Sequence, residues 1–208
     1  MLTDTVVTAL GEMERATLMD IVQRNIVSGF RSQPPIHPVL DLHTPALQRM
    51  QASFVMLRDH GRLVGCAGTV QPSAPLLYDV GHNAYEAACH CAGRNQKEQP
   101  CSQVVTVDVW LVGPLREIQA DSIDALCEQL NVGSDGALLE HATGRATLTP
   151  DKWRGFPEPQ DFVRQLCDKA GLAEDEWGDD VQVAVYTVEP LPAIEVNLDD
   201  SWRSTKPR

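Results

Sequence analysis

One cysteine lies between two glycines in an apolar stretch, residues 63–70, that has the composition of a β-strand. Because glycine has no Cβ, Gly65 and Gly68 can take positive φ and leave the backbone N–H groups around Cys66 open to a ligand. The pattern therefore predicts a reachable Cys66 thiol as the candidate catalytic group, with Gly65 and Gly68 as candidate substrate-binding positions. The alternative is that Cys66 packs as a small hydrophobe in a bulged strand.

A nucleophilic cysteine needs a base or a positive field to populate its thiolate. The sequence offers three polar residues near this strand: His60 in the turn before it, and His82 and Asn83 in the helix after it. We expect Asn83 to orient the backbone of Gly65 and Cys66, although a polar residue that bridges two packed elements is as natural an interpretation. His60 is also explained as a solvated turn residue.

A second group of thiol and imidazole side chains invites a zinc interpretation. Its members are His82, Glu86, Cys89, His90, Cys91 and Cys101. Cys89 and Cys91 point to different sides of the predicted helix, and Cys-x-Cys is not the usual spacing of zinc ligands. We therefore favour no metal site. The sequence also contains no phosphate loop, dinucleotide fingerprint, His-Glu-x-x-His pair or nucleophile elbow, so we predict no cofactor.

The chain of 208 residues has 29 acidic and 17 basic side chains and a formal net charge of −12. It lacks a basic cluster that could neutralise a row of phosphates, which argues against nucleic acid and anionic membrane as partners. No apolar run approaches the length of a membrane span, and the N-terminus lacks the pattern of a secretion signal. We therefore expect a cytoplasmic protein with reduced cysteines, and the sequence predicts no particular oligomeric state.

The elements that position these residues follow from hydrophobic periodicity. Apolar residues at helical spacing predict helices over residues 12–30, 77–91, 123–130 and 162–170. Alternating apolar segments predict strands over residues 52–58, 62–70, 105–111, 137–140, 146–149 and 181–188. Helices interspersed with strands in hairpin and crossover patterns predict an α+β fold with a mixed sheet packed against helices.

Several segments together resemble one family. Residues 63–68 are similar to the signature Leu-Arg-Gly-Cys-Ile-Gly of the AMMECR-one domain family, known in bacteria as AmmeMemoRadiSam system protein A. Residues 52–57 are similar to the strand that precedes this signature. Further matching segments follow in the family's order: Asn83-Ala84, Ala87-Ala88, residues 105–114, Asp135-Gly136, Pro150 with Trp153, and residues 166–172. The likeness extends from about Glu14 to Glu189.

This resemblance implies a two-lobed α+β fold, with a larger lobe, a smaller lobe and the signature segment at a cleft between them. On this basis we expect one domain over residues 1–195 and a polar, weakly ordered tail over residues 196–208. The family implies no settled reaction. Its bacterial members are associated with Memo-like and radical-SAM proteins, which are therefore the expected partners in a shared pathway.

The chain departs from the family pattern at two places. Val64 replaces the signature arginine, and the family's Asp-Pro-Arg-Phe after the alanine-rich helix is missing. An arginine beside a cysteine favours the thiolate and can hold an anionic substrate. Its loss weakens the hypothesis of an active thiol enzyme at Cys66.

These observations lead to three hypotheses. The leading one is a small-molecule or peptide cleft centred on Cys66, either catalytic through its thiol or binding a substrate for the shared pathway. The alternative is a non-catalytic interaction module whose cleft or edge strand engages a partner protein. A weaker alternative is an accessory protein stabilised by zinc in the region from Cys89 to Cys101.

Overall fold

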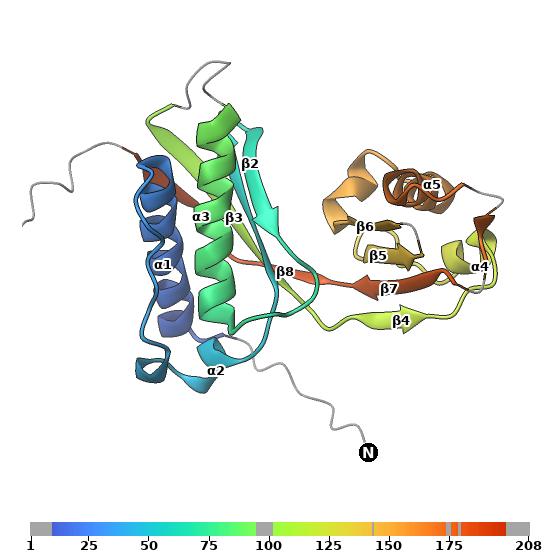
Figure 1. Cartoon of the computed structure of the whole chain (residues 1–208), viewed down its shortest axis with the longest axis horizontal. Coiled ribbons are helices and arrows are strands. Elements are labelled where there is room, and N and C mark those ends of the chain that lie inside the picture. The colour runs from blue at the N-terminus through green and yellow to red at the C-terminus, as the bar shows by residue number, and fades with distance from the viewer. Residues whose placement is uncertain (1–9, 95–101, 143, 174–175, 179, 199–208) are drawn as a thin grey trace, which may run out of the picture. The chain divides into compact units, whose positions relative to one another are not determined.

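The computed structural model describes residues 10–94, 102–142, 144–173, 176–178 and 180–198. The chain divides into two compact units, one formed by Met1–Leu111 with Pro190–Arg208 and the other by Val112–Glu189 (Figure 1). Each unit has its own cluster of buried apolar side chains. No helix in the described ranges is both long and apolar enough to cross a bilayer.

The first unit is built on a five-stranded sheet. Its strand order is β2 (Arg62–Gly68), β1 (Ser53–Asp59), β3 (Val104–Val112) and β8 (Val188–Pro190), and β9 (Ile194–Asn197) also pairs with β3. Helix α1 (Glu12–Phe30) packs against α3 (Leu76–Arg94), which in turn packs against β1 and β2 (Figure 1). The short helices η1 (Leu40–Leu42) and α2 (Pro45–Gln48) lie between α1 and β1 in the chain.

One face of this sheet and the two long helices enclose the core of the first unit. Leu18 of α1 and the alternate positions Val55 and Leu57 of β1 are fully buried in that core. Because successive strand residues point to opposite faces, Met56 and Arg58 lie on the other side of the sheet. We call that side, opposite the helices, the outer face.

A tight hairpin fixes the position of β2 against β1. The two residues between the strands, His60 and Gly61, have φ values of +48° and +80°. Positive φ at both central positions is the mark of a type I′ turn, which suits the twist of paired strands and readily accepts glycine. The register is antiparallel from this turn onward and carries one irregularity between Leu57 and Arg58.

The second unit is a four-stranded antiparallel sheet with short helices. Its strand order is β4 (Arg116–Ile118), β7 (Gln182–Tyr186), β5 (Gly136–His141) and β6 (Gly144–Leu148). The helices are α4 (Ile123–Cys127), η2 (Pro150–Arg154) and α5 (Pro159–Ala170). In its core the rings of Trp153 and Phe162 stack with centroids 4.0 Å apart.

The α+β class is confirmed, but the strands form two antiparallel sheets rather than one mixed sheet. The strand predicted over 181–188 is divided at Thr187, because β7 belongs to one sheet and β8 to the other. The polar tail is predicted to begin at residue 196, but Val196 is buried and belongs to β9, which continues to Asn197. The remainder of that tail, from residue 199, lies outside the described residues.

Candidate functional site

Cys66 is an exposed residue on β2, which lies at the edge of the first sheet. It pairs in register with Met56 of β1, so its side chain belongs to the outer face. Among the other described cysteines, Cys89 is partly buried, and the buried ones are Cys91, Cys127 and Cys167. Cys66 is thus the exposed member of this set, and the reactivity of its thiol stays a prediction.

The two glycines beside Cys66 are explained by close packing. A Cβ on Gly65 would lie 2.2 Å from the carbonyl oxygen of Ala87 in α3, and a Cβ on Gly68 would lie 2.4 Å from the carbonyl oxygen of Ser53. The positive φ that we expected is wrong for Gly65, because its φ lies outside the left-handed range. Gly68 does have a φ of +157°. Both glycines therefore let β2 approach its neighbours closely.

Val64, at the arginine position of the signature that residues 63–68 resemble, is part of the core. It is 7% exposed and clusters with the apolar side chains that face the helices. The register explains this position: Leu57 pairs with Gly65 and Arg58 with Leu63, so Val64 is the extra residue of a β-bulge. The substitution thus places an aliphatic side chain where it contributes to packing.

Asn83 does not orient the Cys66 backbone in the way that the sequence suggested. Its Nδ2 donates to the Ser53 carbonyl oxygen at 3.2 Å, to Ser53 Oγ at 3.0 Å and to Asp79 Oδ1 at 2.9 Å. The Ser53 carbonyl also accepts the N–H of Thr69, at 3.3 Å. Asn83 therefore acts on the end of β2 indirectly, by fastening α3 to the start of β1.

Asp79 completes this buried polar cluster. It is 5% exposed, and its Oδ1 accepts a hydrogen bond from Ser53 Oγ at 2.6 Å. Burial raises the pKa of the Asp79 carboxyl, against the opposing effects of hydrogen bonds from Ser53 and the charge of His82. The cluster lies inside the unit, so its role is to hold α3, β1 and the end of β2 together.

The histidine that contacts the Cys66 segment is His90, which sequence reasoning had considered only as a zinc ligand. Its Nδ1 lies 3.0 Å from the Cys66 carbonyl oxygen. Because a carbonyl only accepts, Nδ1 carries the proton in this contact. Helical spacing could have revealed this contact, since His90 follows Ala87 by one turn and Ala87 packs on Gly65.

The two histidines considered as bases for Cys66 are engaged elsewhere. The side chain of His60 is 89% exposed, and its Nε2 lies 3.8 Å from Asp59 Oδ1. His82 is exposed on α3, where its charge acts on Asp79. We therefore no longer regard either residue as the base for this thiol.

At the hairpin, Asp59 contacts both Ser102 and His60, but the three residues do not form a catalytic triad. The Ser102 hydroxyl donates directly to Asp59, and the Ser102 N–H donates to Asp59 Oδ2 at 3.3 Å. The hydrogen bond from the Ser102 side chain holds the pKa of Asp59 below its usual value. A serine nucleophile needs an imidazole between itself and the carboxylate. Here the serine bonds directly to the carboxylate, so the contact holds the start of β3 against the end of β1.

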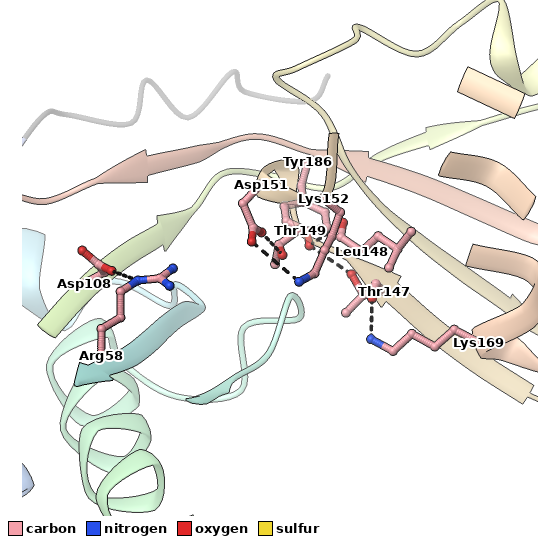
Figure 2. A network of polar contacts seen from close by, with 9 residues as sticks. All are labelled: Arg58, Asp108, Thr147, Leu148, Thr149, Asp151, Lys152, Lys169 and Tyr186. Carbon is pink, nitrogen blue, oxygen red and sulfur yellow. Dashed lines mark hydrogen bonds and ion pairs between the residues drawn. The ribbon is translucent and has the colours of Figure 1, made fainter. Parts of the chain in front are cut away.

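The outer face carries an ion pair close to Cys66. Arg58 Nε lies 2.9 Å from Asp108 Oδ2, with the two side chains 32% and 26% exposed (Figure 2). Asp108 pairs in register with Met56, which pairs on its other side with Cys66. The thiol and the ion pair therefore share one face of three adjacent strands.

Polar contacts in the second unit have a structural character. The Tyr186 hydroxyl donates to the Leu148 carbonyl oxygen at 3.2 Å and lies 3.0 Å from Thr147 Oγ1 (Figure 2). Burial raises the pKa of Tyr186 to about 12. This phenol therefore stays protonated and joins β7 to β6 rather than serving as an acid or base near neutral pH.

In the described part of the chain no three His, Cys, Asp or Glu side chains are grouped so that they could hold a metal ion. Cys101, one member of the zinc hypothesis, lies outside the described residues. The zinc-stabilised alternative thus stays a prediction, which metal analysis of the purified protein would check.

Comparisons with known proteins place the chain in a family. A model of the AMMECR1 family matches residues 19–191. A protein of Methanococcus aeolicus is 26% identical over 153 residues, covering 68% of this chain and 73% of that protein. Protein TK0174 of Thermococcus kodakarensis is 28% identical over 185 residues, covering 83% of this chain and 86% of that protein.

A solved structure supports the fold. The crystal structure of the uncharacterized protein PH0010 from Pyrococcus horikoshii superposes with a TM-score of 0.68 at 23% identity, covering 86% of this chain and 95% of that chain. Because the family model spans most of the sequence, including the Cys66 strand, this chain belongs to the AMMECR1 family.

Proposed function

We propose that this chain binds a small molecule or a peptide at the outer face of its first sheet, with Cys66 at the centre of the site. The bound compound belongs to a pathway that the chain shares with Memo-like and radical-SAM proteins. The observation that carries this proposal is the exposure of Cys66 on a strand whose position is held from both sides by close contacts at Gly65 and Gly68.

His90 supports a chemical role for the site. Its Nδ1–H donates to the Cys66 carbonyl oxygen at 3.0 Å, which holds the ring beside this strand. The buried Ser53, Asp79 and Asn83 cluster fixes the end of the same strand. A thiol on such a supported element is better suited to chemistry than one on a mobile loop.

Alkylation of Cys66 by iodoacetamide tests the proposal. We expect Cys66 to react faster near neutral pH in the folded protein than in the urea-unfolded chain, because the fold presents and activates the thiol. Mass spectrometry of the peptides assigns the modified residue, and the buried Cys127 and Cys167 are internal controls that should react slowly in the folded state. Slower reaction of Cys66 in the folded state would contradict the proposal.

The edge position of β2 favours a second function, that of an interaction module. Val64 in the core also favours it, since no signature arginine supports the thiol. Pull-down of a Memo-like or radical-SAM protein by the intact chain and by Cys66→Ala separates the two functions. Equal capture by both, together with a protected thiol, would indicate a module; loss of capture in the variant would support the site at Cys66.

A further inference from the structure

Arg58 is a close charged neighbour of Cys66 on the outer face. Cys66 pairs with Met56, and Arg58 follows Met56 by two residues on the same strand and face. In a regular antiparallel pair such diagonal neighbours have Cβ atoms roughly 7 Å apart, and here the bulge at Val64 lies between the two registered pairs, Met56 with Cys66 and Arg58 with Leu63. The Nε of Arg58 is held toward Asp108 of β3, which pairs with Met56 and so lies in the same cross-strand row as Cys66.

The Arg58 guanidinium is held on one side only. Asp108 Oδ2 accepts from its Nε at 2.9 Å. Within the described residues no hydrogen bond involves its Nη1 or Nη2, and 32% of the side chain is exposed. Fixing Nε orients the planar group, and the two Nη atoms remain as a fork of N–H donors.

We propose that Arg58, positioned by Asp108, is the anion-recognising residue of the Cys66 site, and that the natural ligand carries a carboxylate. A guanidinium fork matches the two oxygens of a carboxylate, which a single ammonium does not. This inference rests on the proposed function and adds to it the chemical class of the ligand. If the Arg58–Asp108 pair had only a structural role, removing Arg58 would change the stability of the fold but not the preference of Cys66 for anionic over neutral compounds.

Two alkylating reagents that differ in charge test this selectivity. Iodoacetate and iodoacetamide have nearly the same size and form the same S–C bond with loss of iodide, but only iodoacetate carries a carboxylate. Their rate ratio at Cys66 cancels changes in exposure and in thiolate fraction, which affect both reagents alike. We expect Arg58→Gln to lower the iodoacetate-to-iodoacetamide ratio roughly three- to tenfold, the range for loss of one charge at this separation.

Arg62→Gln is the matched control. It removes the same charge from the same hairpin, but Arg62 pairs with Asp59 and lies on the other face of the sheet. We expect it to lower the ratio by less than about twofold. Arg58→Gln leaves Asp108 unpaired, and if that variant does not fold, the double variant R58Q/D108N removes both charges. The iodoacetate-to-iodoacetamide ratio of the double variant should fall below that of D108N alone.

An Arg58→Gln ratio equal to that of Arg62→Gln would overturn the inference. That failure is distinguishable from failure of the proposed function. If Cys66 reacts with iodoacetamide faster in the folded state while the ratio does not respond to Arg58, only the carboxylate assignment fails. If Cys66 is protected from both reagents in the folded state, the site itself fails.

Discussion

At the residue scale, Asp79 is a carboxylic acid in the core of the first unit. Its pKa is raised by burial, so the folded state holds the proton more tightly than the unfolded chain. The stability that Asp79 contributes is therefore present below its unfolded pKa, about 4, and is lost as pH rises through its folded pKa. Urea unfolding should show that the stability difference between wild type and Asp79→Asn decreases as pH rises from about 4 to about 7.

Asp59→Asn is the control for Asp79→Asn, because the pKa of Asp59 is lowered in the folded state whereas that of Asp79 is raised. The Ser102 hydrogen bond lowers its pKa, so its contribution is present above the unfolded pKa and is lost as pH falls through the folded pKa. The stability difference between wild type and Asp59→Asn should increase with pH in the acid range. A difference for Asp79→Asn that also grows with pH would show that its carboxyl is not destabilised by burial.

Single residues were predicted from the sequence only as far as local spacing allows. The sequence offers a bridge between two packed elements as one interpretation of Asn83, and the structure shows such a bridge, but its partners Ser53 and Asp79 depend on how α3 lies on β1. The contact of His90 with Cys66 depends on the same packing. Tertiary neighbours of this kind have no signal in the pattern of one segment.

At the element scale, Gly65 determines how closely β2 and α3 approach. A Cβ there would lie 2.2 Å from the backbone oxygen of Ala87, which no side-chain rotation relieves. We expect Gly65→Ala to lower the free energy of unfolding by about 1–3 kcal/mol through overpacking. Gly155→Ala is the control, because its nearest contact is the Lys152 oxygen at an ordinary 3.6 Å. Equal unfolding midpoints for the two variants would show that the helix moves away at little cost.

The long elements were predictable because their signals are local. The helix over 12–30 is found with these bounds as α1, and the helix predicted over 162–170 ends at the predicted residue as α5, before Gly171 with its φ of +75°. Short strands were not predicted: β4 has three residues and β9 has four, too few to show a period. The division of the last predicted strand at Thr187 reflects the passage of the chain between two sheets, which no local pattern encodes.

At the scale of the whole molecule, the two units keep separate cores. The first core contains residues from α1, α3 and the first sheet, and the second contains residues from α4, α5 and the second sheet. The proposed site and its supporting cluster all belong to the first unit. A substitution in the core of the second unit should therefore leave the reactivity of Cys66 intact as long as the first unit stays folded.

Phe162→Ala tests this separation. Phe162 is fully buried and stacks on Trp153, so its truncation should cost about 3–5 kcal/mol. Because those contacts lie inside the second unit, hydrogen exchange should accelerate in β5, β6 and α5 while the amides of β1 and β3 keep their protection. Alkylation of Cys66 should proceed at the wild-type rate. Equal loss of protection in both sheets would mean that the two cores unfold as one cooperative unit, and the Cys66 strand would then depend on the whole chain for its support.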